Sequence, residues 1–191
     1  MGFFDALLGG KGKLKGVAPD RLFAMTTAYI TMQTGLEMKS TGGAGIVFQP
    51  LDTADFSQIL KDAEELLRGT AQETGSSLES ADDEFGYRWI ILRDPDFDDL
   101  VVSLNTLSTE LQGGGYGDRL LAAVFSFEDA KAKRIHFIYN FKRGAFYPFV
   151  PAPGDKQRDS ERELRLKAQL DKELPFEQEL TRWFPLWEIP V

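Results

Sequence analysis

Residue types that commonly perform catalysis are sparse in this chain of 191 residues, which contains one histidine, His136, and no cysteine. A Ser-His-Asp system needs a serine and an aspartate that converge on the histidine, and no nucleophile-elbow sequence is present. One histidine excludes a multi-histidine metal site within a single chain, and the lack of cysteine excludes disulfides and thiolate ligands. We therefore expect His136 to be a surface or half-buried strand residue.

One group of carboxylates, at Asp94, Asp96, Asp98 and Asp99, suggests a calcium loop. An EF-hand that began at Asp94 would need glycine at its sixth position and glutamate at its twelfth, where the chain has Asp99 and Asn105. The same carboxylates suit the start of a helix, with Asp96 as the N-cap and the next two acids near the positive end of the helix dipole. We interpret this group as a helix cap.

A second acidic group precedes a predicted strand and consists of Glu79, Asp82, Asp83 and Glu84. Hydrolysis by paired carboxylates requires a defined separation between them, and nothing in this spacing supplies it. The group is typical of a solvated turn, and it could also contact a basic partner.

Two glycine-rich segments, at residues 42–45 and 113–117, are similar in composition to phosphate-binding loops. A phosphate loop follows a strand and opens a helix, so that backbone N–H groups point at the anion. Both segments lie instead between a predicted helix and a predicted strand. They are interpreted as helix ends and turns, and no cofactor is expected.

The elements that would position these residues follow from hydrophobic periodicity. Helices are predicted at residues 19–36, 52–69, 96–113 and 157–174, and strands at residues 45–50, 77–80, 86–93, 120–127, 135–141 and 145–150. Pro148 lacks a backbone donor, so the last strand is predicted to be an edge. Hairpins outnumber crossovers, which predicts a single α+β domain whose mainly antiparallel sheet of about five to six strands has helices packed on it.

Charge and hydropathy argue against several further classes of protein. The net charge of −8 argues against nucleic-acid binding, because a phosphate backbone requires a basic face. No run approaches the roughly 20 apolar residues that span a bilayer. The N-terminus does not resemble a signal peptide, because its lysines follow the short apolar stretch. These features predict a cytoplasmic protein, organised as an N-terminal arm at residues 1–18 and a domain at residues 19–191.

The arm is the strongest candidate for a contact surface, since it combines apolar and basic side chains in an otherwise acidic chain: Phe3, Phe4, Leu7, Leu8, Lys11, Lys13 and Lys15. A buried Phe or Leu contributes at most about 1.5–3 kcal/mol. Each lysine near an anionic membrane adds about 1 kcal/mol. The pattern predicts weak, reversible contact with a partner or a membrane surface. The alternative is that Phe3 and Leu7 dock on the core of the protein itself.

Two further groups of residues are candidates for binding. The aromatic C-terminal residues Trp183, Phe184 and Trp187 could seal a groove of the core or anchor a partner. The alternative function is a small-ligand-binding module or an enzyme, with a pocket on the sheet formed by Arg134, His136 and Tyr139.

Seven segments are distinctive as strings and are spread along nearly the full chain, at residues 1–9, 18–24, 82–89, 93–97, 139–149, 158–168 and 183–190. They include the opening Met-Gly-Phe-Phe-Asp-Ala-Leu-Leu-Gly and the closing Trp-Phe-Pro-Leu-Trp-Glu-Ile-Pro. The chain resembles the actinobacterial PspA-associated protein PspAB family. This resemblance implies a partner of the phage-shock-protein A system, which protects the cell envelope under stress. It implies a non-enzymatic accessory or adaptor protein that binds a PspA-like protein, cytoplasmic or peripheral at the inner face of the membrane, and it carries over no catalytic residues.

Overall fold

The computed structural model describes residues 21–191, with residues 70–74 described by their backbone alone. Its elements along the chain are α2 (Ala24–Gly35), β1 (Lys39–Phe48), α3 (Ala54–Thr74), β2 (Ser77–Asp82), β3 (Arg88–Arg93), α4 (Phe97–Gly113), the 3-10 turn η2 (Gly117–Arg119), β4 (Leu120–Glu128), β5 (Arg134–Asn140), β6 (Ala145–Phe149), β7 (Pro151–Ala152), β8 (Gln157–Arg158), α5 (Ser160–Leu170) and η3 (Leu180–Arg182).

Strands β1 to β6 form one sheet in the order β2-β3-β1-β4-β5-β6, and every neighbouring pair is antiparallel. In the middle of the sheet, Ile46 of β1 pairs with Ile90 of β3 and with Ala123 of β4. Strand β6, which contains Pro148, ends the order, and an isolated bridge joins its Phe146 to Phe176. The single α+β domain, its antiparallel sheet and the edge position of Pro148 are thus confirmed.

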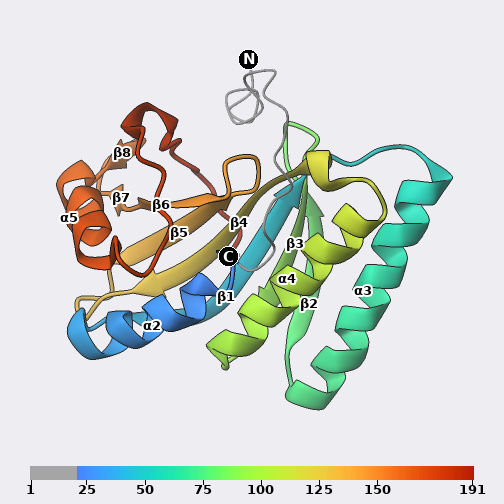
Figure 1. Cartoon of the computed structure of the whole chain (residues 1–191), viewed down its shortest axis with the longest axis horizontal. Coiled ribbons are helices and arrows are strands. Elements are labelled where there is room, and N and C mark those ends of the chain that lie inside the picture. The colour runs from blue at the N-terminus through green and yellow to red at the C-terminus, as the bar shows by residue number, and fades with distance from the viewer. Residues whose placement is uncertain (1–20) are drawn as a thin grey trace.

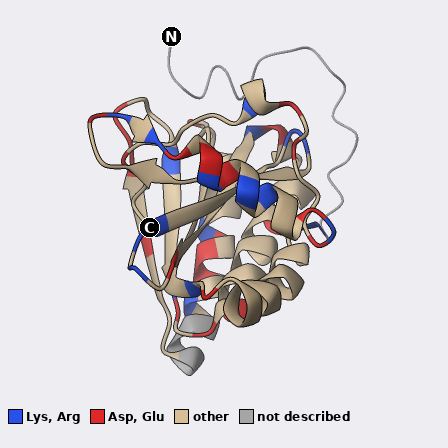
Figure 2. Ribbon diagram, turned by 90° about the vertical axis from the view of Figure 1, so that its left-hand side faces the viewer, with Lys and Arg blue, Asp and Glu red and all other residues tan. Residues whose placement is uncertain are grey.

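Helices α2, α3 and α4 cover one face of the sheet (Figure 1). Successive strand residues point to opposite faces, so β4 contributes Phe125 and Phe127 to the helix side and Val124 to the other side. The opposite side carries its own apolar cluster, closed by the end of the chain (Figure 2). Both faces of β4 are therefore buried, as its apolar pattern predicts.

Strand β1 begins at Lys39, so the interpretation of residues 42–45 as a turn ahead of the strand is wrong. The pairing of β1 with β4 shifts register between Ser40 and Ala44, which marks a bulge, and Gly42 there has a φ of 75°. Three predicted helices also have different bounds. The first, predicted at residues 19–36, occupies Ala24–Gly35. The helix predicted to end at residue 69 continues to Thr74, and the last helix occupies only Ser160–Leu170.

The acids before α4 act as a helix cap, as predicted. The Asp96 side chain accepts a hydrogen bond from the backbone N–H of Asp98 at 2.9 Å, and Asp98 and Asp99 occupy the first turn. The buried Asp94 carboxylate accepts from the N–H of Asp96 at 2.7 Å. Among the described residues, no cluster of histidine and acidic side chains is suited to hold a metal ion, and no helix has the length and apolarity to cross a membrane.

Candidate binding site

The C-terminal tail, residues 183–191, lies across the sheet face that the helices leave open. Trp183, Leu186 and Val191 are buried there against side chains of the sheet. The Trp183 ring stacks on Tyr147 with 6.4 Å between centroids, and its Nε1 donates to the backbone oxygen of Glu177 at 2.9 Å. The tail therefore forms a third layer of the domain, opposite the helices.

Arg158 fastens the start of this tail. Its Nη1 donates to the backbone oxygen of Trp183 at 2.7 Å, while its Nη2 lies 2.6 Å from Oε2 of Glu163. Glu163 is 1% exposed, and its Oε1 also accepts from the N–H of Val150 at 2.8 Å. A buried carboxylate needs such compensation, and Arg158 supplies it while holding the tail.

The end of the tail is held by three side chains from three strands. Arg134 donates to the backbone oxygen of Val191 at 3.0 Å, Ser126 Oγ to the same oxygen at 3.4 Å, and Arg93 to the backbone oxygen of Pro190 at 3.3 Å. These contacts fix where the tail crosses the sheet and hence the shape of the hollow beside it.

A surface hollow of about 500 Å³ lies between this tail, the loop that joins β2 to β3, and the turn between β7 and β8. We call it the acidic pocket. It is lined by Ala81, Asp82, Asp83, Glu84, Phe85, Trp89, Lys156, Pro185, Leu186, Trp187, Glu188 and Pro190.

Aromatic side chains form much of the wall of the acidic pocket. Trp89 comes from β3 and is 5% exposed, whereas Phe85 on the β2–β3 loop is 55% exposed. The half-buried Trp187 ring meets Phe149 edge-on, with 5.0 Å between centroids. Packing against the sheet thus orients the indole of Trp187 before any ligand arrives.

The charges of the pocket are mostly negative. Asp82 pairs with Arg88 through contacts of 2.7 and 2.9 Å, and these hydrogen bonds lower the pKa of Asp82 below its ordinary value. Asp82 is therefore ionised at neutral pH. Asp83 Oδ1 accepts from the N–H groups of Phe85 and Tyr87, both at 2.9 Å, which shapes the loop.

Two carboxylates of the pocket, Glu84 and Glu188, are exposed and form no ion pair with any residue that the structure describes. Lys156 also lines the pocket, and its charge is opposite to that of these two carboxylates. Glu188 and Lys156 have φ angles of 64° and 49°, in the left-handed region that non-glycine residues seldom adopt. Chemically, carboxylates beside aromatic faces are suited to bind a cation.

The residues predicted to contact a partner lie in different surroundings from one another. Of the three tail aromatics, Trp183 is buried, Phe184 and Trp187 are half-buried, and Trp187 lines the acidic pocket. The arm candidates lie outside the described residues: Phe3, Phe4, Leu7, Leu8, Lys11, Lys13 and Lys15.

The three residues of the alternative pocket do not come together. His136 is buried on the tail side, so the prediction of a surface or half-buried position is wrong. Its Nδ1 lies 2.8 Å from Ser126 Oγ and its ring stacks on Phe149. Burial, with the nearby Arg134, lowers the pKa of His136 to about 3, so the ring is neutral at physiological pH. Tyr139 lies on the opposite face of β5, in the helix-side core, where burial raises its pKa to about 12.

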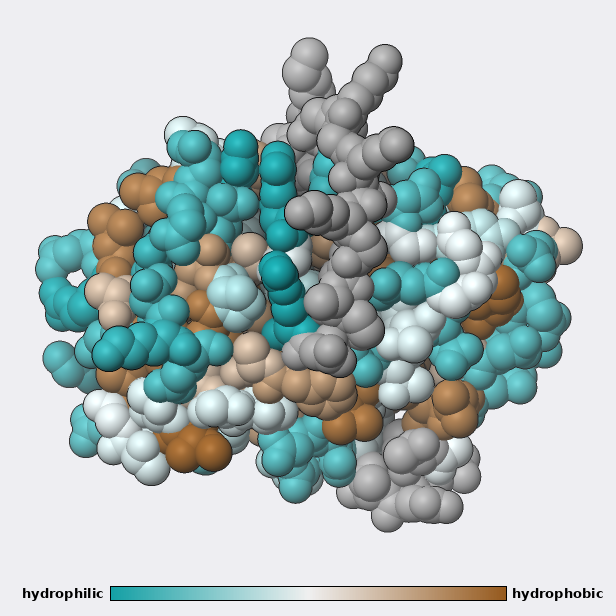
Figure 3. All heavy atoms as spheres, in the orientation of Figure 1, coloured by the Kyte–Doolittle hydropathy of each residue, from teal (hydrophilic) through white to brown (hydrophobic). Residues whose placement is uncertain are grey.

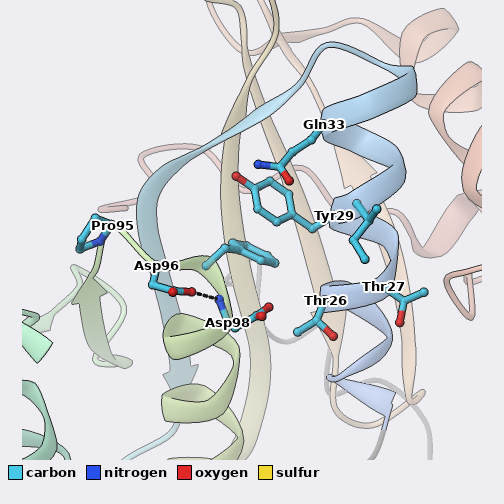
Figure 4. Close-up of a pocket in the computed structure, with 9 residues that line it drawn as sticks. Thr26, Thr27, Tyr29, Gln33, Pro95, Asp96 and Asp98 are labelled. Carbon is cyan, nitrogen blue, oxygen red and sulfur yellow. Dashed lines mark hydrogen bonds between the residues drawn. The ribbon is translucent and has the colours of Figure 1, made fainter.

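A second hollow, of about 420 Å³, lies between α2 and the start of α4 (Figure 4). Thr26, Tyr29 and Gln33 face it from α2, and the N-cap Asp96 and Asp98 face it from the start of α4. Asp96 is engaged in capping α4, as the dashed bond shows. In the same orientation as Figure 1, the lower part of the molecular surface carries both hydrophobic and hydrophilic residues (Figure 3).

The sequence did not predict that the residues lining the acidic pocket come together. The sequence indicates Trp187 and the acids at residues 82–84 separately, and it favours a solvated turn for these acids, with contact to a basic partner as the alternative. It missed Trp89, Lys156 and Glu188 as neighbours of these groups. The sequence feature that could have indicated this pocket is the C-terminal segment rich in aromatic residues and prolines. Such a segment is too apolar to remain exposed.

Comparisons with known proteins give one informative result. No curated protein and no solved structure matches the chain. A family model, that of PspA associated protein B, matches residues 1–191. Because this match extends over the whole chain, the protein belongs to the PspAB family.

Proposed function

We propose that this protein is a non-enzymatic adaptor of a PspA-type envelope-stress response and acts by binding a PspA-like protein. The observation that carries the proposal is the family match over all 191 residues, since the family is described as associated with PspA. The proposed location is the cytoplasm, with peripheral contact at the inner face of the membrane.

The acidic pocket is the surface we assign to this partner. It combines a hollow of about 500 Å³ with an exposed Phe85, a preoriented Trp187 and carboxylates without an ion-pair partner in the described part of the chain. Tryptophan anchors in pockets are typical of the residues that dominate binding energy at interfaces. In contrast, the single histidine of the sequence is enclosed under the tail, which favours a structural role for it.

The experiment is co-purification of the full chain with the PspA-like protein of the same organism. Replacing Glu84 and Glu188 by lysine should weaken the association by about tenfold or more, because charge reversal at a rim opposes a basic partner. Glu79→Lys with Glu110→Lys is the matched control, since both residues are exposed and lie outside the pocket. Failure of the unaltered protein to associate would reject the proposed function.

The N-terminal arm is proposed as a second contact, to an anionic membrane surface. Its four apolar and three basic side chains motivate this proposal. Co-sedimentation with anionic vesicles, with and without residues 1–16, tests it at low and high salt. We expect binding that is lost with the arm and weakened by salt. Equal sedimentation of both forms would remove the arm from the proposal.

A further inference from the structure

We propose that the acidic pocket binds the cationic side chain of an arginine or lysine presented by a partner protein, and holds it between the indole of Trp187 and the carboxylates of Glu84 and Glu188. For the identity of that partner the inference rests on the proposed function. For the chemistry of the ligand it rests on the pocket alone.

The pocket has room for one long side chain, and its walls suit a cationic one. About 500 Å³ lies within the range of pockets that enclose small ligands. Cations bind favourably over the faces of tryptophan and other aromatic rings, and the walls provide Trp89, Trp187 and Phe85. The apolar stem of an arginine or lysine can lie along such walls while its charged end reaches carboxylates.

The same corner of the molecule already contains an interaction of this type. The guanidinium of Arg158 lies over the Phe149 ring, 5.5 Å from its centroid, while it pairs with Glu163. Phe149 in turn makes a T-shaped contact with Trp187. An aromatic face, a guanidinium and a carboxylate are thus combined within the domain next to the pocket.

Charge complementarity selects a cation over an anion or a neutral ligand. Among the described residues that line the pocket there are four carboxylates, at Asp82, Asp83, Glu84 and Glu188, and one cation, Lys156. Arg88 pairs with Asp82 from outside the lining set. Four negative charges against these two positive charges leave a net charge of −2. A cation entering the pocket would therefore gain at least one unopposed carboxylate.

Titration with N-acetyl-arginine amide, followed by tryptophan fluorescence, tests the inference on the full chain. The N-acetyl-citrulline amide is the neutral counterpart of the same shape. We expect saturable binding of the arginine compound, at least about tenfold weaker binding of the citrulline compound, and weakening as salt is raised. Equal binding of both compounds, or no saturable change with either, would overturn the inference.

Paired substitutions locate the binding. The double substitution Glu84→Gln and Glu188→Gln removes both exposed carboxylates from the pocket, and we expect it to weaken arginine binding by about tenfold or more. Glu79→Gln with Glu110→Gln removes the same charge from exposed positions outside the pocket and should change binding by less than about twofold. Equal effects of the two pairs would mean that net charge attracts the ligand, which contradicts a defined site.

A second source of cations is the chain itself, through Lys11, Lys13 and Lys15. If removal of residues 1–16 tightens arginine binding about tenfold or more, the protein's own arm occupies the pocket, and the assignment to a partner protein is overturned. Failure of the proposed function can be distinguished from failure of this inference. If the protein binds arginine but does not co-purify with the PspA-like protein, the proposed function is refuted. If it co-purifies but does not bind arginine, only this inference is refuted.

Discussion

Val191 packs so closely on Gly45 that a Cβ atom on residue 45 would lie 2.8 Å from Cγ1 of Val191. This contact joins the middle of β1 to the end of the tail, two segments far apart in the sequence. The tail also forms one wall of the acidic pocket. The absence of a side chain at residue 45 is therefore part of what positions the candidate site.

The first prediction concerns this contact. Gly45→Ala should destabilise the protein by about 1–3 kcal/mol, because the added methyl group overpacks a site where Val191 and the sheet backbone are both close. Urea unfolding measures the loss. Adding Val191→Ala removes the clashing Cγ1 and should recover part of it, whereas additive effects in the double variant would contradict direct contact.

Gly69→Ala is the control for that experiment. Gly69 lies within α3, and nothing stands within 4 Å of the Cβ that the substitution would add. Alanine is favoured over glycine in a helix by up to about 1 kcal/mol, so this variant should be neutral or more stable. A comparable loss in both glycine variants would mean that the effect at residue 45 does not come from the tail.

Features of the fold that depend on residues close together in the sequence are predictable from the sequence. The apolar pattern of residues 120–127 predicts a central strand, which β4 is, and the spacing of the acids alone identifies Asp96 as a cap. The glycines of β1 are misleading, because their sequence pattern is that of a turn. The physical reason for Gly45 in a strand is the approach of Val191, a contact that no local pattern encodes.

The candidate site is harder to predict for the same reason. Its lining residues come from the β2–β3 loop, the β7–β8 turn and the tail, and only tertiary packing brings them together. Strand alternation alone could have separated Tyr139 from His136, because residues an odd number apart on a strand point to opposite faces. The predicted arm at residues 1–18 stays a prediction, since it lies outside the described residues.

The second prediction concerns Arg158. Arg158→Ala should cost about 3–5 kcal/mol, because it leaves the buried Glu163 carboxylate without its ion pair and frees the backbone oxygen of Trp183. Thermal and urea unfolding measure the loss. Because Arg158 also holds the tail, the variant should additionally show altered tryptophan emission in the native state.

Arg165→Ala is the matched control for Arg158→Ala. Arg165 pairs with Glu161 on the same helix, but both side chains are more than half exposed, at 62% and 83%. Figure 2 shows acidic and basic residues side by side on α5. Exposed pairs of this spacing contribute only about 0.3–0.5 kcal/mol. Similar losses for the two arginines would contradict a special role for the buried pair.

The third prediction concerns the N-cap of α4. Asp96→Ala should cost about 1 kcal/mol, because the N–H of Asp98 loses its side-chain acceptor. Asp96→Asn retains an oxygen in that position and should lose much less. Urea unfolding of the three proteins decides the question, and an equally large loss for both substitutions would indicate that the charge, not the cap geometry, stabilises the helix.

The fourth prediction concerns His136 and pH. Its pKa is about 3 in the folded protein and near the ordinary 6.5 when unfolded, so between these values only the unfolded chain binds the proton. Stability contributed by the neutral ring is complete above pH 6.5 and falls as the pH drops toward 3. The slope approaches about 1.4 kcal/mol per pH unit.

Other carboxylates also titrate at low pH, so the measurement needs a reference that lacks only this histidine. His136→Asn keeps a hydrogen-bonding atom near the position of Nδ1, which contacts Ser126 Oγ at 2.8 Å, and removes the titrating ring. The unfolding free energy of the original protein should fall more steeply than that of the variant between about pH 6.5 and pH 4. Parallel curves over this interval would show that the ring is accessible to protons in the folded state, and the tail would then not enclose it.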